Sequence, residues 1–435
     1  MKKILFIIIA ISFMAANAFG QKTAAPVTKT PKEAVDKFMD LRFGMFIHFG
    51  PVTLRGTEIG WSRNEQVPQA DYDNLYKEFN PVLFNADAWV KTAKDAGMKY
   101  LSITAKHHDG FCLWPTAFSS YNISNSPFKR DIVGELAKAC KQQGIVFCIY
   151  FTVLDWHDPD YAINRNAKVP NTKGNMQAFV GTMKNELKEL ITKYHPAMLW
   201  FDGNWEDPWK LEYGQDVYNF IKSIDANVVI NNRLGKGEHV AFSEGSVGDY
   251  LTPEQKIGNL NMVDPWESCI TICNQWAWKP NDGMKSVKEC IQTLIKTAAG
   301  NGNLLFNVGP MMDGRIEQRQ VNQLKDMGAW LNKYGASIYG TKGGPFVPNN
   351  LFAATRKGNK IFLHVFNQDG STLVLPQIKN AQILKAYFMG GKAVDFKQDA
   401  GIFIYLPARL PDENSSVIVL ELDADAEELP VIPKV

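Results

Sequence analysis

The side chains best suited to catalysis follow short apolar segments at five places along the chain. Such segments predict strands, and polar groups at successive strand ends can face a common mouth. Histidine, carboxylate, arginine and aromatic groups gathered there would hold a polyhydroxylated ligand by hydrogen bonds and stacking. The five places are His48, the run KHHDGF at 106–111, Tyr150 with Asp155, Asp202, and Arg233.

Asp202 is the candidate nucleophile of this set. It follows the apolar run 198–201 and precedes a glycine and the aromatic-rich stretch 205–209. A carboxylate held by a rigid strand beside indoles is suited to attack an electrophilic carbon. The alternatives are that Asp202 only caps the next helix and that Arg233 forms a surface ion pair.

The spacing of histidines and cysteines does not predict a metal site. His107 and His108 are adjacent, and neighbouring side chains on a strand point to opposite faces, which makes joint chelation awkward. Cys269 and Cys273 have no second Cys or His pair at zinc-ligand spacing. We therefore expect no metal and no cofactor, and we expect the six cysteines to be small buried hydrophobic residues.

The elements that must position these groups alternate between strand-like and helix-like segments. Alternation repeated this often requires parallel strands with covering helices. About eight such units in roughly 300 residues fit a (β/α)8 barrel better than a doubly wound sheet, and we assign the catalytic barrel to 31–342. The apolar runs are 44–49, 100–105, 146–153, 197–201, 228–231, 269–273 and 304–308; the helix-like stretches are 86–97, 131–144, 175–194, 213–225, 284–299 and 317–334.

The sequence changes character after residue 344. All 11 Trp and all six Cys precede this point. Short alternating apolar runs follow, separated by Asn, Asp and Gly, which is typical of antiparallel strands. The fold class is therefore α/β, with a C-terminal antiparallel β-sandwich over 345–435.

Composition and charge exclude several classes of protein. The 435 residues include 47 Lys plus Arg and 45 Asp plus Glu. The segment 1–20 has a basic start, an apolar run and small residues, typical of a cleaved signal peptide. Its removal takes two lysines and leaves a neutral chain, with no electrostatic reason to bind nucleic acid or an anionic membrane. We expect export to a periplasm or the medium, no membrane span, and a chain compatible with a homo-oligomer.

Four short motifs occur in order along the chain, and the second and third of them form a highly specific pair. They are HFG at 48–50, KHHDGF at 106–111, LWFDG at 199–203 and NGNLLFNVGP at 301–310. Together they resemble the α-L-fucosidases of glycoside hydrolase family 29, over about residues 31–345. The resemblance implies a retaining exo-glycosidase that removes terminal α-linked L-fucose from fucosylated oligosaccharides or glycoconjugates.

The same resemblance implies roles for individual residues. Asp202 would be the nucleophile that forms a covalent fucosyl–enzyme intermediate, and Trp276 would form an aromatic wall near the methyl group of the sugar. Many relatives have an adjacent Glu-Trp pair where this chain has Glu58 and Trp61 with two residues between them. The implied fucose contacts are His48, Glu58, Trp61, His107, His108, Tyr150, Trp200, Arg233 and Trp276.

Three glutamates are candidates for the acid/base that protonates the leaving oxygen. Glu254 lies in LTPEQ at 251–255, Glu267 in WESC at 266–269, and Glu244 between Ser243 and Gly245. We expect Glu254 first, Glu267 second and Glu244 third. Retention requires the two carboxyl groups about 5–5.5 Å apart, in environments that keep one protonated and the other ionised.

Two other functions are compatible with these motifs. Another retaining (β/α)8 glycosidase, such as an α-galactosidase, needs the same carboxylate pair but a pocket that binds one more hydroxyl group. A non-catalytic fucose-binding protein on an inactive barrel is the alternative of a different class. The loops contain no motif that indicates the preferred linkage or the leaving glycan.

Overall fold

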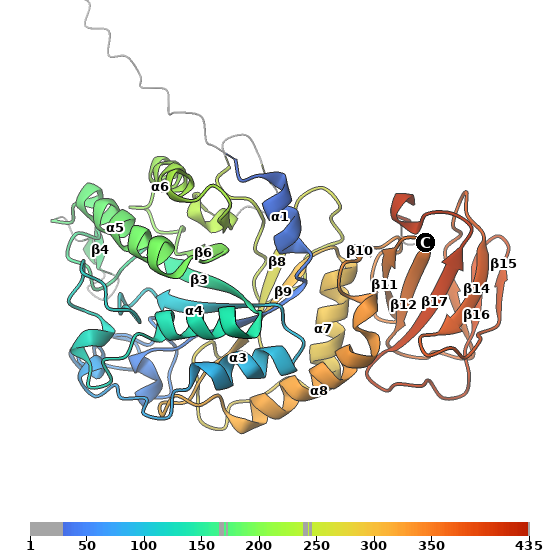
Figure 1. Ribbon diagram of the computed structural model, residues 1–435, viewed down its shortest axis with the longest axis horizontal. Coiled ribbons are helices and arrows are strands. Elements are labelled where there is room, and N and C mark those ends of the chain that lie inside the picture. The colour runs from blue at the N-terminus through green and yellow to red at the C-terminus, as the bar shows by residue number, and fades with distance from the viewer. Residues whose placement is uncertain (1–28, 165–168, 171–172, 238–241, 243–245, 434–435) are drawn as a thin grey trace, which may run out of the picture.

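Seven parallel strands form the central sheet of the larger part of the molecule (Figure 1). The computed structural model describes residues 29–433 except 165–168, 171–172, 238–241 and 243–245, so the predicted signal segment 1–20 and Glu244 lie outside the described residues. The sheet order is β7-β6-β3-β2-β1-β9-β8. The strands are β1 Phe43–Ile47, β2 Tyr100–Lys106, β3 Val146–Thr152, β6 Met198–Asp202, β7 Val229–Ile230, β8 Glu267–Thr271 and β9 Asn303–Val308.

The segment 249–255 takes the place of an eighth strand and closes the barrel. On the β7 side, the Asn232 amide donates to the Tyr250 carbonyl at 2.9 Å. On the β8 side, the Glu267 amide donates to the Leu251 carbonyl at 2.8 Å. Parallel bridges on both sides give the segment the direction of its neighbours. The predicted (β/α)8 barrel is therefore confirmed, although its eighth strand is absent from the predicted runs.

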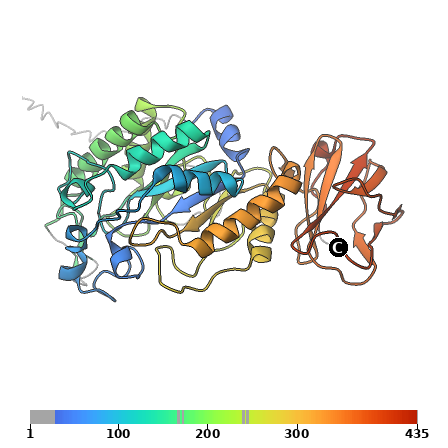
Figure 2. The ribbon, with the colours of Figure 1, turned by 60° about the horizontal axis from the view of Figure 1, so that its bottom comes forward.

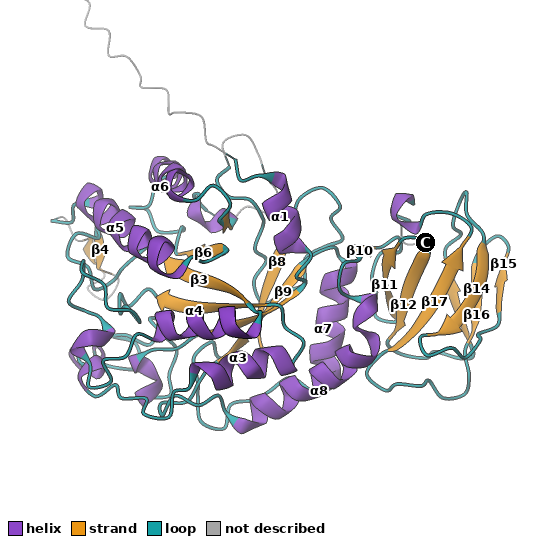
Figure 3. Ribbon diagram, viewed as in Figure 1, coloured by secondary structure: helices purple, strands orange, loops and turns teal. Residues whose placement is uncertain are grey.

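Long helices cover the outside of the barrel (Figure 3). Their starts are capped as the sequence suggests: Asn85, Asp131 and Asn175 accept hydrogen bonds from first-turn amides, and Ser286 with Glu289 forms a capping box. Between β7 and β8 the described residues contain no α-helix. The covering helices are α3 Ala86–Asp95, α4 Ile132–Gln143, α5 Met176–Tyr194, α6 Leu211–Ile224, α7 Val287–Ala299 and α8 Gln318–Tyr334.

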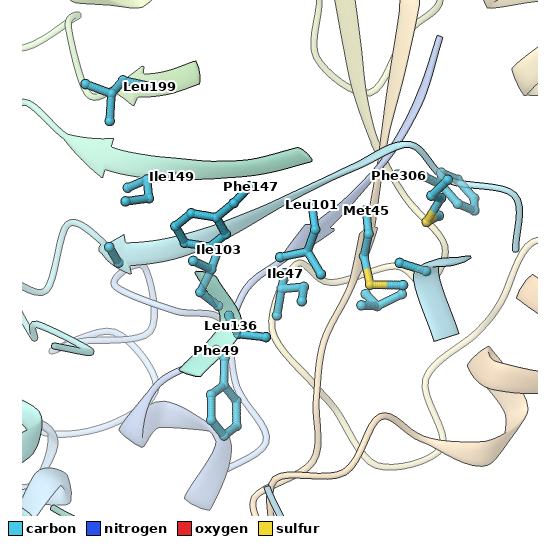
Figure 4. Packing of buried hydrophobic residues seen from close by; sticks show 14 of the residues in the cluster. Met45, Ile47, Phe49, Leu101, Ile103, Leu136, Phe147, Ile149, Leu199 and Phe306 are labelled. Atoms are coloured by element: carbon cyan, nitrogen blue, oxygen red, sulfur yellow. The ribbon is translucent and has the colours of Figure 1, made fainter. Parts of the chain in front are cut away.

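The two-residue period of the strands separates the outer core from the barrel interior. In β6, Leu199 and Phe201 belong to the core under the helices, whereas Trp200 belongs to a separate interior cluster. Asp202, two residues after Trp200, falls on the interior side. Figure 4 shows part of the outer core, including Met45 and Leu199.

Helix α1 (Lys32–Met39) closes the N-terminal end of the barrel. Its Phe38 ring lies 5.3 Å from the rings of both Tyr100 and Tyr250, which point into the interior. The opposite end of the barrel, at the C-terminal ends of the strands, forms its open mouth. Short elements fill the connections: α2 Gln69–Tyr72, β4 Ile163–Asn164, β5 Val169–Pro170, and 3-10 turns at Pro51–Leu54, Leu75–Lys77, Ile123–Asn125, Asn232–Leu234, Gly335–Ser337 and Ala426–Glu428.

The C-terminal part packs two antiparallel sheets around a second core, beside α7 and α8 (Figure 2). The sheet orders are β10-β11-β12-β17-β14 and β13-β16-β15. Trp330 of α8 donates its indole N–H to the Ser415 carbonyl at 3.1 Å across the junction. The strands are β10 Lys342–Gly343, β11 Phe352–Lys357, β12 Lys360–Val365, β13 Thr372–Leu375, β14 Ile383–Phe388, β15 Phe396–Gln398, β16 Ile402–Tyr405 and β17 Ser416–Leu422.

Two further expectations concern the whole chain. The six cysteines are buried and free, as expected for small hydrophobic residues. Over the described ranges, none of the helices has the length and apolar character needed to cross a bilayer.

Candidate active site

Asp202 lies at the mouth of the barrel, at the end of β6. Its Oδ1 accepts a hydrogen bond from Arg233 Nη1 at 2.8 Å, and its Oδ2 accepts one from the Tyr150 hydroxyl at 3.1 Å. Nε2 of His108 is 3.5 Å from the same Oδ2. Burial alone would raise the pKa of Asp202, but the Arg233 charge and the His108 contact outweigh it and hold the pKa below its usual range. The carboxylate is therefore ionised at neutral pH.

Arg233 binds both candidate catalytic carboxylates. Its Nη2 lies 2.8 Å from Glu254 Oε2, while its Nη1 binds Asp202. The guanidinium is oriented by Thr252, whose hydroxyl accepts from Nε at 3.0 Å and whose carbonyl accepts from Nη2 at 3.2 Å. It also lies 4.8 Å from the centre of the Trp200 ring. The side chain of Asp202 is 13% exposed and that of Glu254 is 41% exposed, so the two carboxylates occupy different environments.

His108 is oriented by a threonine on the neighbouring strand. Nδ1 of His108 lies 2.8 Å from Thr152 Oγ1, and that hydroxyl donates its own proton to the Leu154 carbonyl at 2.8 Å. Nδ1 must then carry a proton, which leaves Nε2 facing Asp202. A side chain outside the predicted set therefore determines how this histidine contacts Asp202.

His48 is held by Asn307, and burial keeps its imidazole neutral. Nδ1 of His48 lies 2.6 Å from Asn307 Oδ1, and the Asn307 amide donates to the Trp276 carbonyl at 2.8 Å. Burial lowers the pKa of His48 to about 3. Nδ1 is thus the protonated nitrogen, and Nε2 is an acceptor. The Trp276 ring lies 4.9 Å from the His48 ring.

His107 and Tyr150 form a stack beside Asp202. Their ring centres are 5.2 Å apart at an angle of 7°, and Tyr150 also stacks on Trp200 at 5.5 Å. Burial, reinforced by the neighbouring His108 and His48, lowers the pKa of His107 well below its usual value. The stack presents a neutral imidazole to the interior.

Glu58 and Trp61 also reach this region, in different ways. The Glu58 carboxylate accepts hydrogen bonds from the backbone amides of Trp276 at 2.8 Å and Ala277 at 2.9 Å. It therefore anchors the loop that carries Trp276. The Trp61 ring lies 5.8 Å from the His108 ring, at the rim.

Glu267 lies on the floor of the barrel. The predicted run began at Cys269, but β8 begins two residues earlier, which puts Glu267 at the N-terminal end of the strand. The carboxyl group is fully buried and accepts hydrogen bonds from the Tyr100 hydroxyl and from Trp200 Nε1, the latter at 3.1 Å. Burial raises its pKa to about 8. Trp200 thus separates the two glutamates, with Glu267 below it and the Arg233–Glu254 pair above it.

Other polar residues of the predicted strand ends serve the scaffold. Lys106 Nζ lies 2.8 Å from Asp155 and 3.0 Å from Glu186, all three buried. Asp109 accepts a hydrogen bond from the Tyr72 hydroxyl at 2.7 Å. The Lys106 cluster and the Tyr72–Asp109 hydrogen bond therefore pair these polar groups within the scaffold, and they hold the loops that carry the histidines.

Sequence reasoning missed three residues that position the site: Thr152, Thr252 and Asn307. Asn307 was visible as a polar residue inside the apolar run 304–308, at a position of the NGNLLFNVGP motif. Thr152 and Thr252 carry no comparable signal, because threonine is ordinary at strand ends.

Known proteins to which this chain is similar in sequence and fold are α-L-fucosidases. A family model described as alpha-L-fucosidase matches residues 11–336. The putative alpha-L-fucosidase of Caenorhabditis elegans is 30% identical over 345 residues, covering 73% of this chain and 68% of the relative. The tissue alpha-L-fucosidase of Rattus norvegicus is 30% identical over 332 residues, covering 70% of each.

Solved structures give the same result over most of the chain. Alpha-L-fucosidase isoenzyme 1 from Paenibacillus thiaminolyticus matches with a TM-score of 0.82 and 33% identity, covering 90% of this chain and 99% of that one. A GH29 enzyme from Bacteroides thetaiotaomicron, trapped as a covalent intermediate with 2-fluoro-fucosyl fluoride, has a TM-score of 0.82 and 30% identity, covering 92% and 98%. The chain therefore belongs to the α-L-fucosidase family, glycoside hydrolase family 29.

Proposed function

We propose that this protein hydrolyses terminal α-L-fucosyl linkages of glycans and retains the anomeric configuration, with Asp202 as the nucleophile. One observation carries the proposal: Asp202, ionised and fixed by Tyr150, shares the Arg233 guanidinium with Glu254. A retaining glycosidase needs such a pair of close carboxyl groups in unlike environments. The trapped intermediate of the Bacteroides relative supports a covalent route.

The two carboxyl groups divide the reaction between them. In the first step an Asp202 oxygen bonds to the anomeric carbon, the glycosidic bond breaks, and the leaving oxygen takes a proton from Glu254. In the second step the Glu254 carboxylate takes a proton from water, the water oxygen attacks the anomeric carbon, and the ester bond to Asp202 breaks. A proton on Glu254 removes its attraction to Arg233, and its exposed side chain is then able to turn to the leaving oxygen.

The pocket around Asp202 fits a 6-deoxy sugar. The interior face offers neutral imidazoles from His48 and His107, which can bind hydroxyl groups without a charge. Trp276 lies against His48 and offers an apolar wall. A methyl group is stabilised at such a wall, whereas a hydroxyl group there would lose its hydrogen bonds.

Glu254 is our choice for the acid/base, and Glu267 is the alternative. Glu254 is at the mouth and is bound to the same cation as the nucleophile. Glu267 is fully buried below Trp200, where a leaving group has no route to it. We expect the Glu254→Ala variant to lose activity on substrates with poor leaving groups, which need its proton. Azide should restore turnover of a fucoside with a good leaving group, for which only the second step is blocked.

The product of azide rescue tests both assignments. Azide that replaces the nucleophile in Asp202→Gly should give β-fucosyl azide, whereas azide that replaces the acid/base in Glu254→Ala should give α-fucosyl azide. Glu267→Ala is the matched control and should give no azide product. Rescue in Glu267→Ala instead of Glu254→Ala would transfer the acid/base role to Glu267. No turnover of fucosides by the unaltered protein would overturn the proposal itself.

We also propose export through the N-terminal segment 1–20, which supports a periplasmic or secreted enzyme. The mass of the protein recovered from an exporting host tests this, because cleavage removes that segment. An intact N-terminus in the cytosolic fraction would contradict it.

A further inference from the structure

The loop after β6 leaves one indole exposed beside the nucleophile. All 11 tryptophans lie in the described part of the chain, and Trp205, at 39%, is the only one classed as exposed. A large aromatic side chain left partly in water forgoes part of the free energy of burial, and this one lies at the mouth of the barrel.

The exposure of Trp205 does not come from a loose loop. On one side of it, the Asn204 side-chain amide donates to the Gly237 carbonyl at 2.7 Å. On the other side, the Glu206 carboxylate accepts from Trp156 Nε1 at 3.1 Å. The backbone is therefore fastened at both neighbours, and the indole is presented in a defined place.

The indole is oriented by rings that belong to the catalytic end of the barrel. It lies 6.0 Å from Trp61, with the ring planes 19° apart, and 5.5 Å from His108 at 89°. Nε2 of His108 is 3.5 Å from Asp202. The His108 ring thus lies between Trp205 and the Asp202 carboxylate that the sugar must reach.

We propose that Trp205 forms the subsite for the leaving group, where its indole stacks on the hexopyranose ring to which fucose is attached. The proposal rests on the proposed function. An exo-acting pocket encloses the terminal sugar in buried rings such as Tyr150 and Trp200, and the next sugar meets the exposed rim. Aromatic faces bind the apolar faces of pyranose rings, and a rigid indole loses little entropy when it does so.

Two substrates separate the subsite from the fucose pocket. α-L-Fucosyl fluoride has no sugar beyond fucose, whereas a fucosyllactose has one. Trp205→Ala should lower kcat/KM for fucosyllactose about tenfold, as expected for one lost aromatic contact, and change kcat/KM for the fluoride by no more than about twofold. Trp205→Phe should recover most of the loss. Tyr405→Ala, which removes an aromatic side chain of similar exposure from β16, is the matched control.

Three results would count against this assignment, and they are distinguishable. An equal loss on both substrates would overturn it, because Trp205 would then act only through His108 and Asp202. Cleavage of the fluoride but of no fucosyllactose by the unaltered protein would also overturn it, since the rim would serve no sugar. Failure on every fucoside would instead overturn the fucosidase activity on which it rests.

Discussion

Arg233 is the residue on which the charge balance of the site depends. It supplies the only cation that contacts both Asp202 and Glu254 among the described ion pairs. Without it, Asp202 would keep the cost of burial and lose most of what offsets that cost. One guanidinium thus keeps the nucleophile ionised and holds the second carboxylate near it.

Arg233→Met should lower kcat/KM by about 100-fold or more, because a preorganised charge next to the reacting centre is lost. The pKa of Asp202 would rise, so the acidic limb of the profile of kcat/KM against pH should move to higher pH. Arg315→Met, at an exposed pair with Asp313, is the control and should change neither. An acidic limb that stays in place would contradict this account of Asp202.

At the scale of single residues, the candidate site residues were predictable where they lie within a recognisable sequence motif. Asp202, Arg233 and the histidines were found because they follow apolar runs in a known order. Their supports, Thr152 and Thr252, were not, since a hydroxyl group that orients another side chain leaves no pattern in the sequence. Lys106 and Asp155 were predicted at the mouth, but they satisfy each other with Glu186 in a buried cluster.

That buried cluster links β2, the loop after β3, and α5. Burial alone would lower the pKa of Lys106, but Asp155 and Glu186 raise it well above its usual value. Lys106→Met leaves two buried carboxylates without a cation and should lower the free energy of unfolding by about 3–5 kcal/mol. Lys184→Met, at the pair of α5 with Asp216, should cost less than about 1 kcal/mol. Denaturant unfolding of both variants measures the difference, and equal losses would contradict it.

Glu267 gives strand β8 a pH-dependent contribution to stability. Its pKa is about 8 in the folded chain against 4.5 for an ordinary glutamate. A raised pKa means that the folded state keeps a proton that the unfolded state loses, so this stabilisation is complete below pH 4.5 and is lost as pH rises towards 8. The Tm of Glu267→Gln, relative to the unaltered protein, should therefore increase across that window and level off above it. A constant difference would contradict the raised pKa.

The elements themselves were predictable to different degrees. Strands and helices with clear periods and capping residues were placed within a few residues, such as α4 between Asp131 and Gly144. The segment 249–255 was not, because it is short, lacks an alternating apolar pattern and is joined to its two neighbours by isolated backbone bridges and by hydrogen bonds of its polar side chains. That omission hid the element that carries Glu254.

At the scale of the whole molecule, the barrel and the C-terminal sheets share a junction on α7 and α8. Trp330 is buried there, donates to Ser415, and lies 6.2 Å from the His364 ring of β12. Trp330→Ala should lower the free energy of unfolding by about 3–5 kcal/mol without changing kcat/KM of the folded protein. Leu384→Ala, at an exposed position of β14, is the control for Tm. A loss of kcat/KM in Trp330→Ala at a temperature where it is folded would contradict the separation of junction and site.

The two proposed catalytic carboxylates lie on elements of different construction. β6, which carries Asp202, lies between helices α5 and α6 along the chain, whereas no α-helix of the described chain occurs between β7 and β8, where the segment with Glu254 lies. The bond to the sugar would thus form on a strand flanked by two helices, while the proton would come from a segment of the wall without one. Selection for a new glycosidic linkage would act most readily on 253–255, since changes there re-aim the acid, whereas Thr252 also orients Arg233 and through it Asp202.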